Sequence, residues 1–210
     1  MKKVINCTKD HNPHIDKPCR KVSVEEGQLI AAELFDILNK RKDGVGLAAN
    51  QVGIDAAVAV VNVREPLVLI NPEIEDAWDE INYYEGCLSY PGDNKNTKRF
   101  RNVIIKTAQS ESGWYFSGTP SEGEHKGSSE EQQRSKSDNE LRLLEAVCVQ
   151  HEIDHLNGKT IYDRQVNLTV TSTKKIGRNE IVTIKKGDAV KVLKYKKAQR
   201  FLNDNWILQQ

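Results

Sequence analysis

The chain has 210 residues, enough for one sizeable domain or for one domain with a small appendage. Its 31 Lys and Arg residues balance 30 Asp and Glu residues, so the charge of the whole chain points to no particular class of partner. No apolar run reaches the roughly 18 residues of a membrane-spanning helix, and the first residues lack the apolar segment of a secretory signal. The four cysteines are scattered and form no C-x-x-C pair, so we expect reduced thiols in a cytoplasmic protein that makes no membrane contact.

The first regular element follows an extended N-terminal arm. Ser23 precedes Glu25 and Glu26, and apolar residues at helical spacing come next, as expected for a capped amphipathic helix. We predict this helix from about Val24 to Lys40, and we expect it to cover one side of the core.

Small residues dominate the next stretch, GVGLAANQ at residues 44–51. Glycine and alanine permit a close approach of the backbone, either to another structural element or to a ligand. A tight turn between a helix and a strand explains the stretch equally well. It is not a phosphate-binding loop, because no Gly-Lys-Ser/Thr sequence ends it.

Runs of β-branched and aromatic residues then predict four strands. They lie at residues 56–63, 67–74, 98–108 and 114–116. We expect the first two strands to pair in antiparallel fashion. Between the second and third strands, we interpret residues 83–92 as a loop. Cys87 follows Gly86 in this loop, which is an unusual place for a buried structural thiol.

The composition changes at residues 117–137, which are rich in Ser and Gly and poor in apolar residues. This composition predicts a flexible surface insertion, since such a segment buries too little apolar surface to order itself. We expect the next helix to begin at Leu141 and to end at Gly158, a residue typical of helix C-termini.

Residues 166–210 hold ten Lys and Arg against three Asp and Glu. Alternating apolar residues predict two short strands joined at residues 186–188, and a short helix within residues 196–208. We therefore divide the chain into a domain of residues 1–165 and a small, β-rich, basic C-terminal extension. Its charge is explained either by a solvated face or by contact with RNA or another acidic partner.

The helix that follows Leu141 carries the sequence QHEIDH. His151 and His155 lie four residues apart, so their side chains share one helix face, and Glu152 stands directly beside them. His-Glu-x-x-His is typical of metal hydrolases, in which the imidazoles bind a divalent ion and the carboxylate transfers protons. The alternative is a surface helix with two unrelated histidines.

Two histidines leave a catalytic metal under-coordinated, because such sites typically have three protein ligands. Cys87 is the best candidate for the third ligand, since thiolate binds metals strongly and the predicted loop can reach the helix. Cys148 lies near the same helix face, but we expect it to pack as a small hydrophobic residue.

Three motifs together resemble the peptide deformylase family. GVGLAANQ at residues 44–51, EGCLS at 85–89 and QHEIDH at 150–155 occur in the order and approximate spacing of that family. The resemblance covers about residues 10–165. It implies metal-dependent hydrolysis of the N-formyl group from the formylmethionine of nascent polypeptides. We accordingly expect an α+β fold, with antiparallel sheets packed around a central metal-binding helix.

The resemblance also implies a role for individual residues. Cys87, His151 and His155 would bind Fe²⁺, which Ni²⁺, Co²⁺ or Zn²⁺ can replace. Glu152 would act as general base and acid, while the Gln51 amide and the Leu88 backbone N–H would stabilise the oxyanion. The residues expected to contact the peptide are Val45, Gly46, Glu85, Gly86, Val147 and Cys148. As a separate hypothesis, Arg99 pairs with Glu85 and supports the segment around Cys87.

Two positions depart from the family pattern. Tyr90 replaces a small aliphatic residue and could narrow the mouth of the site, and Asn94 stands where many bacterial members have arginine. Alternative functions are a zincin-type protease and a deformylase-like protein that has lost activity and serves as a structural or binding protein. The protease requires a third ligand after the helix, where the sequence offers no histidine and only Glu180. A further hypothesis is that residues 166–210 bind the ribosome or RNA.

Overall fold

The computed structural model covers most of the chain, in two units that are described one after the other below. The described residues are 2–41, 43–119, 129–166, 177–187, 189–202 and 206–209. The chain divides into two compact units, Met1–Asn167 and Leu168–Gln210. Among the described residues, no helix is both long and apolar enough to span a membrane.

The first sheet of the larger unit is small, antiparallel and covered by a helix. It has the strand order β1-β2-β3. Its strands are β1 (Gly46–Ala48), β2 (Val58–Asn62) and β3 (Pro66–Ile70), and the 3-10 helix η1 (Ala49–Val52) follows β1. Helix α1 (Val24–Leu38) packs against β2 and β3 and buries Ala31, Leu34 and Leu38. The Ser23 hydroxyl accepts a hydrogen bond from the Glu26 N–H at 3.2 Å, so the predicted helix and its N-terminal cap are confirmed.

A second antiparallel sheet is built from a long hairpin and one further strand. Its order is β4-β5-β6, with β4 (Glu73–Cys87), β5 (Tyr90–Thr107) and β6 (Ser110–Ser117). The prediction of a loop at residues 83–92 is therefore wrong. Only Leu88 and Ser89 lie between the two strands, and a register shift after Gly86 accommodates Pro91 within the hairpin. Cys87 is thus held rigidly at the end of a strand.

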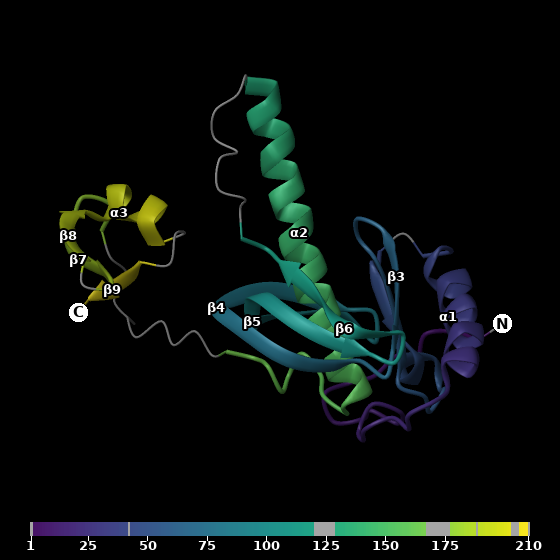
Figure 1. The fold of residues 1–210 in the computed structure, drawn as a ribbon. Coiled ribbons are helices and arrows are strands. Elements are labelled where there is room, and N and C mark those ends of the chain that lie inside the picture. Colours follow the sequence, from purple (N-terminus) through teal and green to yellow (C-terminus); the bar gives the residue numbers. More distant parts are fainter. Residues whose placement is uncertain are drawn as a thin grey trace. The chain divides into compact units, whose positions relative to one another are not determined.

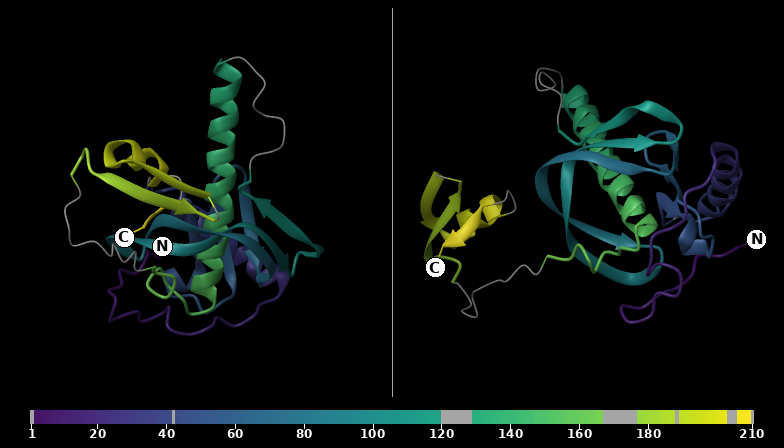
Figure 2. Two further views of the ribbon diagram at one scale, coloured as in Figure 1. Left: turned by 90° about the vertical axis from the view of Figure 1, so that its left-hand side faces the viewer. Right: turned by 60° about the horizontal axis from the view of Figure 1, so that its bottom comes forward.

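Helix α2 (Ser129–Leu156) contacts strands of both sheets (Figures 1 and 2). It begins well before Leu141, so the prediction of a flexible insertion is wrong for residues 129–137, while residues 120–128 lie outside the described residues. Figure 1 shows the first turns of α2 projecting beyond the sheets. These turns need no apolar stripe, because they extend a helix that the packed half already stabilises. After α2, Gly158 adopts a φ of 72°, as predicted for a residue that ends a helix.

The smaller unit has its own sheet and core. It contains β7 (Ile181–Lys186), β8 (Ala189–Lys194), α3 (Tyr195–Leu202) and β9 (Ile207–Gln209), and its strand order is β8-β7-β9. Val182, Ile184 and Ala198 form the centre of its core. The two predicted strands are confirmed. The predicted terminal helix is shorter than expected, because the last residues pair with β7 as a strand.

Candidate active site

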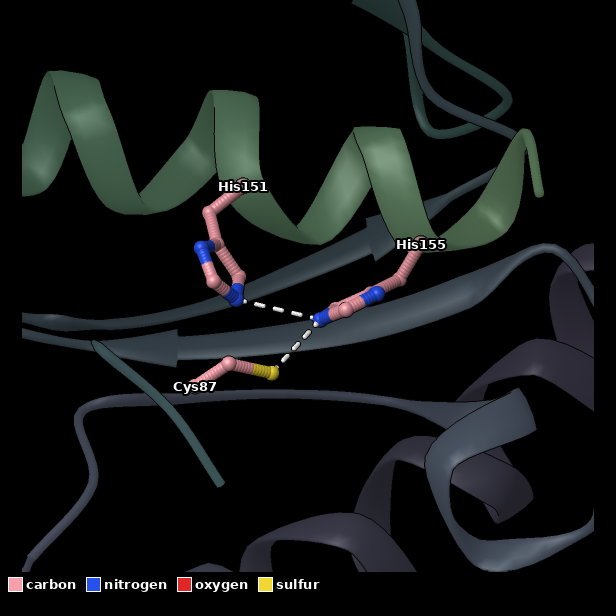
Figure 3. Close-up of side chains that lie close together, drawn as sticks. All are labelled: Cys87, His151 and His155. Atoms are coloured by element: carbon pink, nitrogen blue, oxygen red, sulfur yellow. Dashed lines mark hydrogen bonds between the residues drawn. The ribbon is translucent and has the colours of Figure 1, made fainter. Parts of the chain in front are cut away.

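Three side chains of metal-ligand type converge between α2 and the end of β4. His151 and His155 project from successive turns of α2, and Cys87 approaches from the opposite side (Figure 3). The His155 Nε2 atom lies 3.0 Å from His151 Nε2 and 3.2 Å from Cys87 Sγ. All three ligand atoms lie within 4.8 Å of one another. The structure therefore brings together the three residues that were predicted as metal ligands.

The chemistry of this cluster fits a divalent transition metal ion. Thiolate and imidazole are ligands that such ions prefer in proteins. Burial, together with the charge of His151, holds the pKa of His155 well below its ordinary value, so its ring is neutral at neutral pH. The Sγ atom of Cys87 and the Nε2 atoms of His151 and His155 lie close together inside the protein. Their lone pairs repel one another unless a cation or a proton lies between them.

Glu152 is buried beside the cluster. The residue is 3% exposed, and its Oε2 atom has no hydrogen-bond partner among the described residues. Burial raises the pKa of Glu152 to about 7, because the charged carboxylate is costly away from water. A carboxyl group whose pKa lies near neutral pH is suited to accept and return protons.

Gly46 of β1 packs directly against Glu152 and Cys148. A Cβ atom at this position would lie 2.6 Å from Cys148 Sγ and 2.9 Å from Glu152 Cδ. Only glycine permits β1 to approach α2 this closely. The small residues at 44–51 are therefore explained by close contact with the functional helix as well as by a turn.

The amide of Gln51 is held in one orientation. Its Oε1 atom accepts a hydrogen bond from the Ala48 N–H at 2.8 Å, while its Nε2 donates to Ser89 Oγ at 3.1 Å. The same nitrogen lies 3.6 Å from Cys87 Sγ. The donor end of this buried amide is thus directed at the cluster.

A buried ion pair lies behind His151. The predicted pairing of Arg99 with Glu85 is present, with Arg99 Nε donating to Glu85 Oε1 at 3.0 Å. The other carboxylate oxygen, Oε2, lies 3.5 Å from His151 Nδ1. Burial favours a higher pKa for Glu85, but the hydrogen bond and charge of His151, together with Arg99, lower this pKa to about 2. Glu85 borders the cavity, yet both of its carboxylate oxygens contact protein groups.

A cavity of about 480 Å³ opens beside the cluster. Of the residues expected to contact the peptide, Val45, Gly46, Glu85, Gly86, Val147 and Cys148 all line it. Tyr83 and Leu144 also line it and were missed. Leu144 lies one turn before Val147 on α2, so helical spacing could have identified it. Tyr83 shares a strand face with Glu85, a relationship that the predicted loop concealed.

Tyr90 and Asn94 also border the cavity. Tyr90 is 2% exposed, and its hydroxyl lies 2.5 Å from the side-chain amide of Asn12 in the N-terminal arm. Its ring packs edge-on against that of Tyr162.

Comparison with known proteins agrees with this geometry. The family profile described as polypeptide deformylase matches residues 4–119 and 124–171. The chain belongs to the polypeptide deformylase family. The peptide deformylase of Aquifex aeolicus is 34% identical over 162 residues, which cover 73% of this chain and 82% of that protein. The peptide deformylase of Pseudomonas aeruginosa is 36% identical over 154 residues, covering 71% and 77%.

Solved deformylase structures show the same likeness. A peptide deformylase from Legionella pneumophila matches with a TM-score of 0.58 and 28% identity, covering 80% of this chain and 88% of that chain. A deformylase from Synechococcus elongatus, in complex with actinonin, matches with a TM-score of 0.59 and 29% identity, covering 80% of each chain. The predicted deformylase family and the antiparallel α+β fold are thereby confirmed.

Proposed function

We propose that this deformylase removes the N-formyl group from nascent polypeptides that begin with formylmethionine, in the cytoplasm. The observation that carries the proposal is the convergence of Cys87, His151 and His155 beside a cavity that Glu152 and Gln51 line. No third histidine or glutamate ligand of the zincin type lies at this cluster among the described residues.

We assign the metal ion to Cys87, His151 and His155, with Fe²⁺ as the ion in the cell and Ni²⁺, Co²⁺ or Zn²⁺ as substitutes. The bound ion would supply Lewis acidity, which polarises a carbonyl group and makes a neighbouring water molecule more acidic. The mixed thiolate and imidazole donor set supports this assignment.

Glu152 would transfer protons as general base and general acid. Its pKa of about 7 allows it to take a proton from the attacking water and to return that proton to the leaving amine. The unpartnered Oε2 atom is available for this transfer. Gln51 Nε2 and the Leu88 backbone N–H would donate to the oxygen that becomes negative, and each such donor contributes about 3 kcal/mol in comparable sites.

Two sheet edges border the cavity and suit an extended peptide. Gly46 lies on β1, the edge strand of the first sheet, and Gly86 lies on β4, the edge strand of the second. Backbone groups on such edges can pair with a peptide strand. Val45, Val147 and Cys148 would then receive the unbranched methionine side chain.

The test is anaerobic hydrolysis of formyl-Met-Ala-Ser by protein loaded with Fe²⁺ or Ni²⁺. Glu152→Gln keeps the size of the side chain but removes its ability to act as a base, so we expect kcat to fall by about 10²- to 10⁴-fold. Full metal occupancy with no hydrolysis by the unaltered chain would instead support a deformylase-like protein without activity.

We further propose that the C-terminal unit contacts ribosomal RNA. Lys185, Lys186, Lys191 and Lys194 are exposed on β7 and β8, which supports an electrostatic contact. Replacing Lys185 and Lys186 with glutamate should reduce co-sedimentation with ribosomes and leave formyl-peptide hydrolysis unchanged. Unchanged co-sedimentation at low salt would contradict this proposal.

A further inference from the structure

We infer that Arg164 is a positioning residue, which fixes the orientation of His151 through a chain of buried charges. Arg164 lies in the segment after α2, outside the three motifs and outside the cavity. The inference deepens the proposed function and rests on it only in treating His151 as a metal ligand.

The chain of contacts runs from Arg164 through Asp154 to Arg99. Arg164 Nε donates to Asp154 Oδ2 at 2.9 Å, and its Nη2 donates to Oδ1 at 2.6 Å. Both oxygens of Asp154 are therefore held by one planar guanidinium. Arg99 Nη1 donates to the same Oδ2 at 2.5 Å.

From Arg99 the contacts continue to the cluster. Arg99 binds Glu85 through Nε and Nη2, at 3.0 and 2.5 Å, and Glu85 Oε2 lies 3.5 Å from His151 Nδ1. His151 Nε2 is the atom that faces the other metal ligands. A group that holds the second nitrogen of a metal-binding histidine sets the direction of its ring and its basicity.

The backbone of Arg164 is anchored to the sheet that carries Arg99. The Lys98 N–H donates to the Arg164 carbonyl at 2.9 Å, and the Val166 N–H donates to the Asn96 carbonyl at 2.8 Å. Arg164 therefore approaches Asp154 from a fixed base. Its side chain remains one-third exposed, whereas that of Asp154 is 5% exposed.

The balance of charge explains why Arg164, the residue of this chain of contacts that lies farthest from His151, affects the orientation of His151. Two carboxylates, those of Glu85 and Asp154, are matched by two guanidinium groups, those of Arg99 and Arg164. Without Arg164, Asp154 keeps only Arg99 among the charged partners that the structure describes. Arg99 would then be drawn toward Asp154 and away from Glu85, which loosens the carboxylate that holds His151.

Arg101 provides a matched control. It is two residues beyond Arg99 on β5, and its Nε lies 3.0 Å from Asp79 Oδ2. The Arg101 side chain is 28% exposed and that of Arg164 is 33% exposed, so both arginines pair with an aspartate from a partly exposed position. Asp79 makes no described contact with the network, so Arg101→Gln removes a similar pair without affecting His151.

The experiment measures Ni²⁺ affinity by titration of the metal-free full chain, beside kcat and KM of the loaded enzyme. We expect Arg164→Gln to weaken Ni²⁺ binding by about tenfold, the lower end of the range for residues that support metal ligands. We expect kcat to fall while KM for formyl-Met-Ala-Ser stays constant, because Arg164 does not border the cavity. Arg101→Gln should change neither quantity.

Arg164→Lys is the second variant. It keeps the positive charge and the fold but cannot hold both oxygens of Asp154, so we expect an intermediate Ni²⁺ affinity. Equal Ni²⁺ affinities for Arg164→Gln, Arg101→Gln and the unaltered chain would overturn the inference, even if hydrolysis were normal. Absence of hydrolysis in the unaltered chain, with a Ni²⁺ affinity that still depends on Arg164, would instead overturn the proposed function alone.

Discussion

Gly46→Ala should slow hydrolysis strongly while leaving Cys87, His151 and His155 in place. The added Cβ would lie 2.6 Å from Cys148 Sγ and 2.9 Å from Glu152 Cδ, whereas carbon atoms pack at about 3.5–4.0 Å. Glu152 must therefore move by roughly 1 Å, or β1 must move away from α2 by a similar distance. Misplacement of a reacting group by about 1 Å can cost about 10²-fold in rate, so we expect kcat to fall by about 100-fold.

The assay is steady-state hydrolysis of formyl-Met-Ala-Ser at saturating Ni²⁺, with Ni²⁺ affinity and urea unfolding measured in parallel. Overpacking typically costs about 1–3 kcal/mol, so the free energy of unfolding should fall within that range. Gly92→Ala is the control, because a Cβ there meets nothing within 4 Å although its φ of 84° is strained. Equal kcat values for Gly46→Ala and Gly92→Ala would refute the reasoning from the contact with Glu152.

Three further predictions concern stability. Arg99→Met should lower the free energy of unfolding by about 3–5 kcal/mol, because it leaves the buried carboxylates of Glu85 and Asp154 without the Arg99 guanidinium as counter-ion. A loss below about 1 kcal/mol, measured by urea unfolding, would contradict this prediction. Gly158→Ala should lower the free energy of unfolding by more than the roughly 1 kcal/mol that a left-handed backbone conformation costs an alanine, since its Cβ would also lie 2.8 Å from the Lys17 carbonyl carbon. Thermal unfolding would measure this loss of stability, and an unchanged melting temperature would contradict the prediction. The pKa of Glu85 is lowered from 4.5 to about 2 on folding, so the ionised group adds stability above pH 4.5 that disappears as the pH falls toward 2. Glu85→Gln should therefore flatten the acid-side loss of stability of the metal-free protein, and an unchanged pH profile would show that Glu85 does not contribute to it.

The convergence of Cys87, His151 and His155 was predictable because much of the signal is local in sequence. His151 and His155 lie on one helix face by spacing alone, and Cys87 is a strong ligand type in a distinctive motif. The orientation of Gln51 was not predictable, since it depends on Ser89 in the turn between β4 and β5. Pairing between segments that are distant in sequence is decided by tertiary structure.

The wrong or missing predictions also arise where tertiary structure overrides a local pattern in the sequence. Gly86 and Pro91 indicate a turn by local propensity, yet a register shift within a hairpin accommodates both. The first turns of α2 lack an apolar stripe, yet helix continues through them from the packed half. The links from Asp154 to Arg99 and Arg164 were missed because a sequence shows charges but not which of them are buried together.

The cluster of Cys87, His151 and His155 also brings together parts of the chain that are remote in sequence. Cys87 and His155 are 68 residues apart, one at the end of a strand and the other in the last turn of α2. A cation held by both would act as a reversible cross-link that only the folded chain can form. Mass action then adds about 2.7 kcal/mol of stability when free metal exceeds its dissociation constant by about 100-fold. Metal starvation would accordingly expose the protein to proteolysis as well as stopping catalysis, so the cellular supply of the ion would set how much enzyme persists.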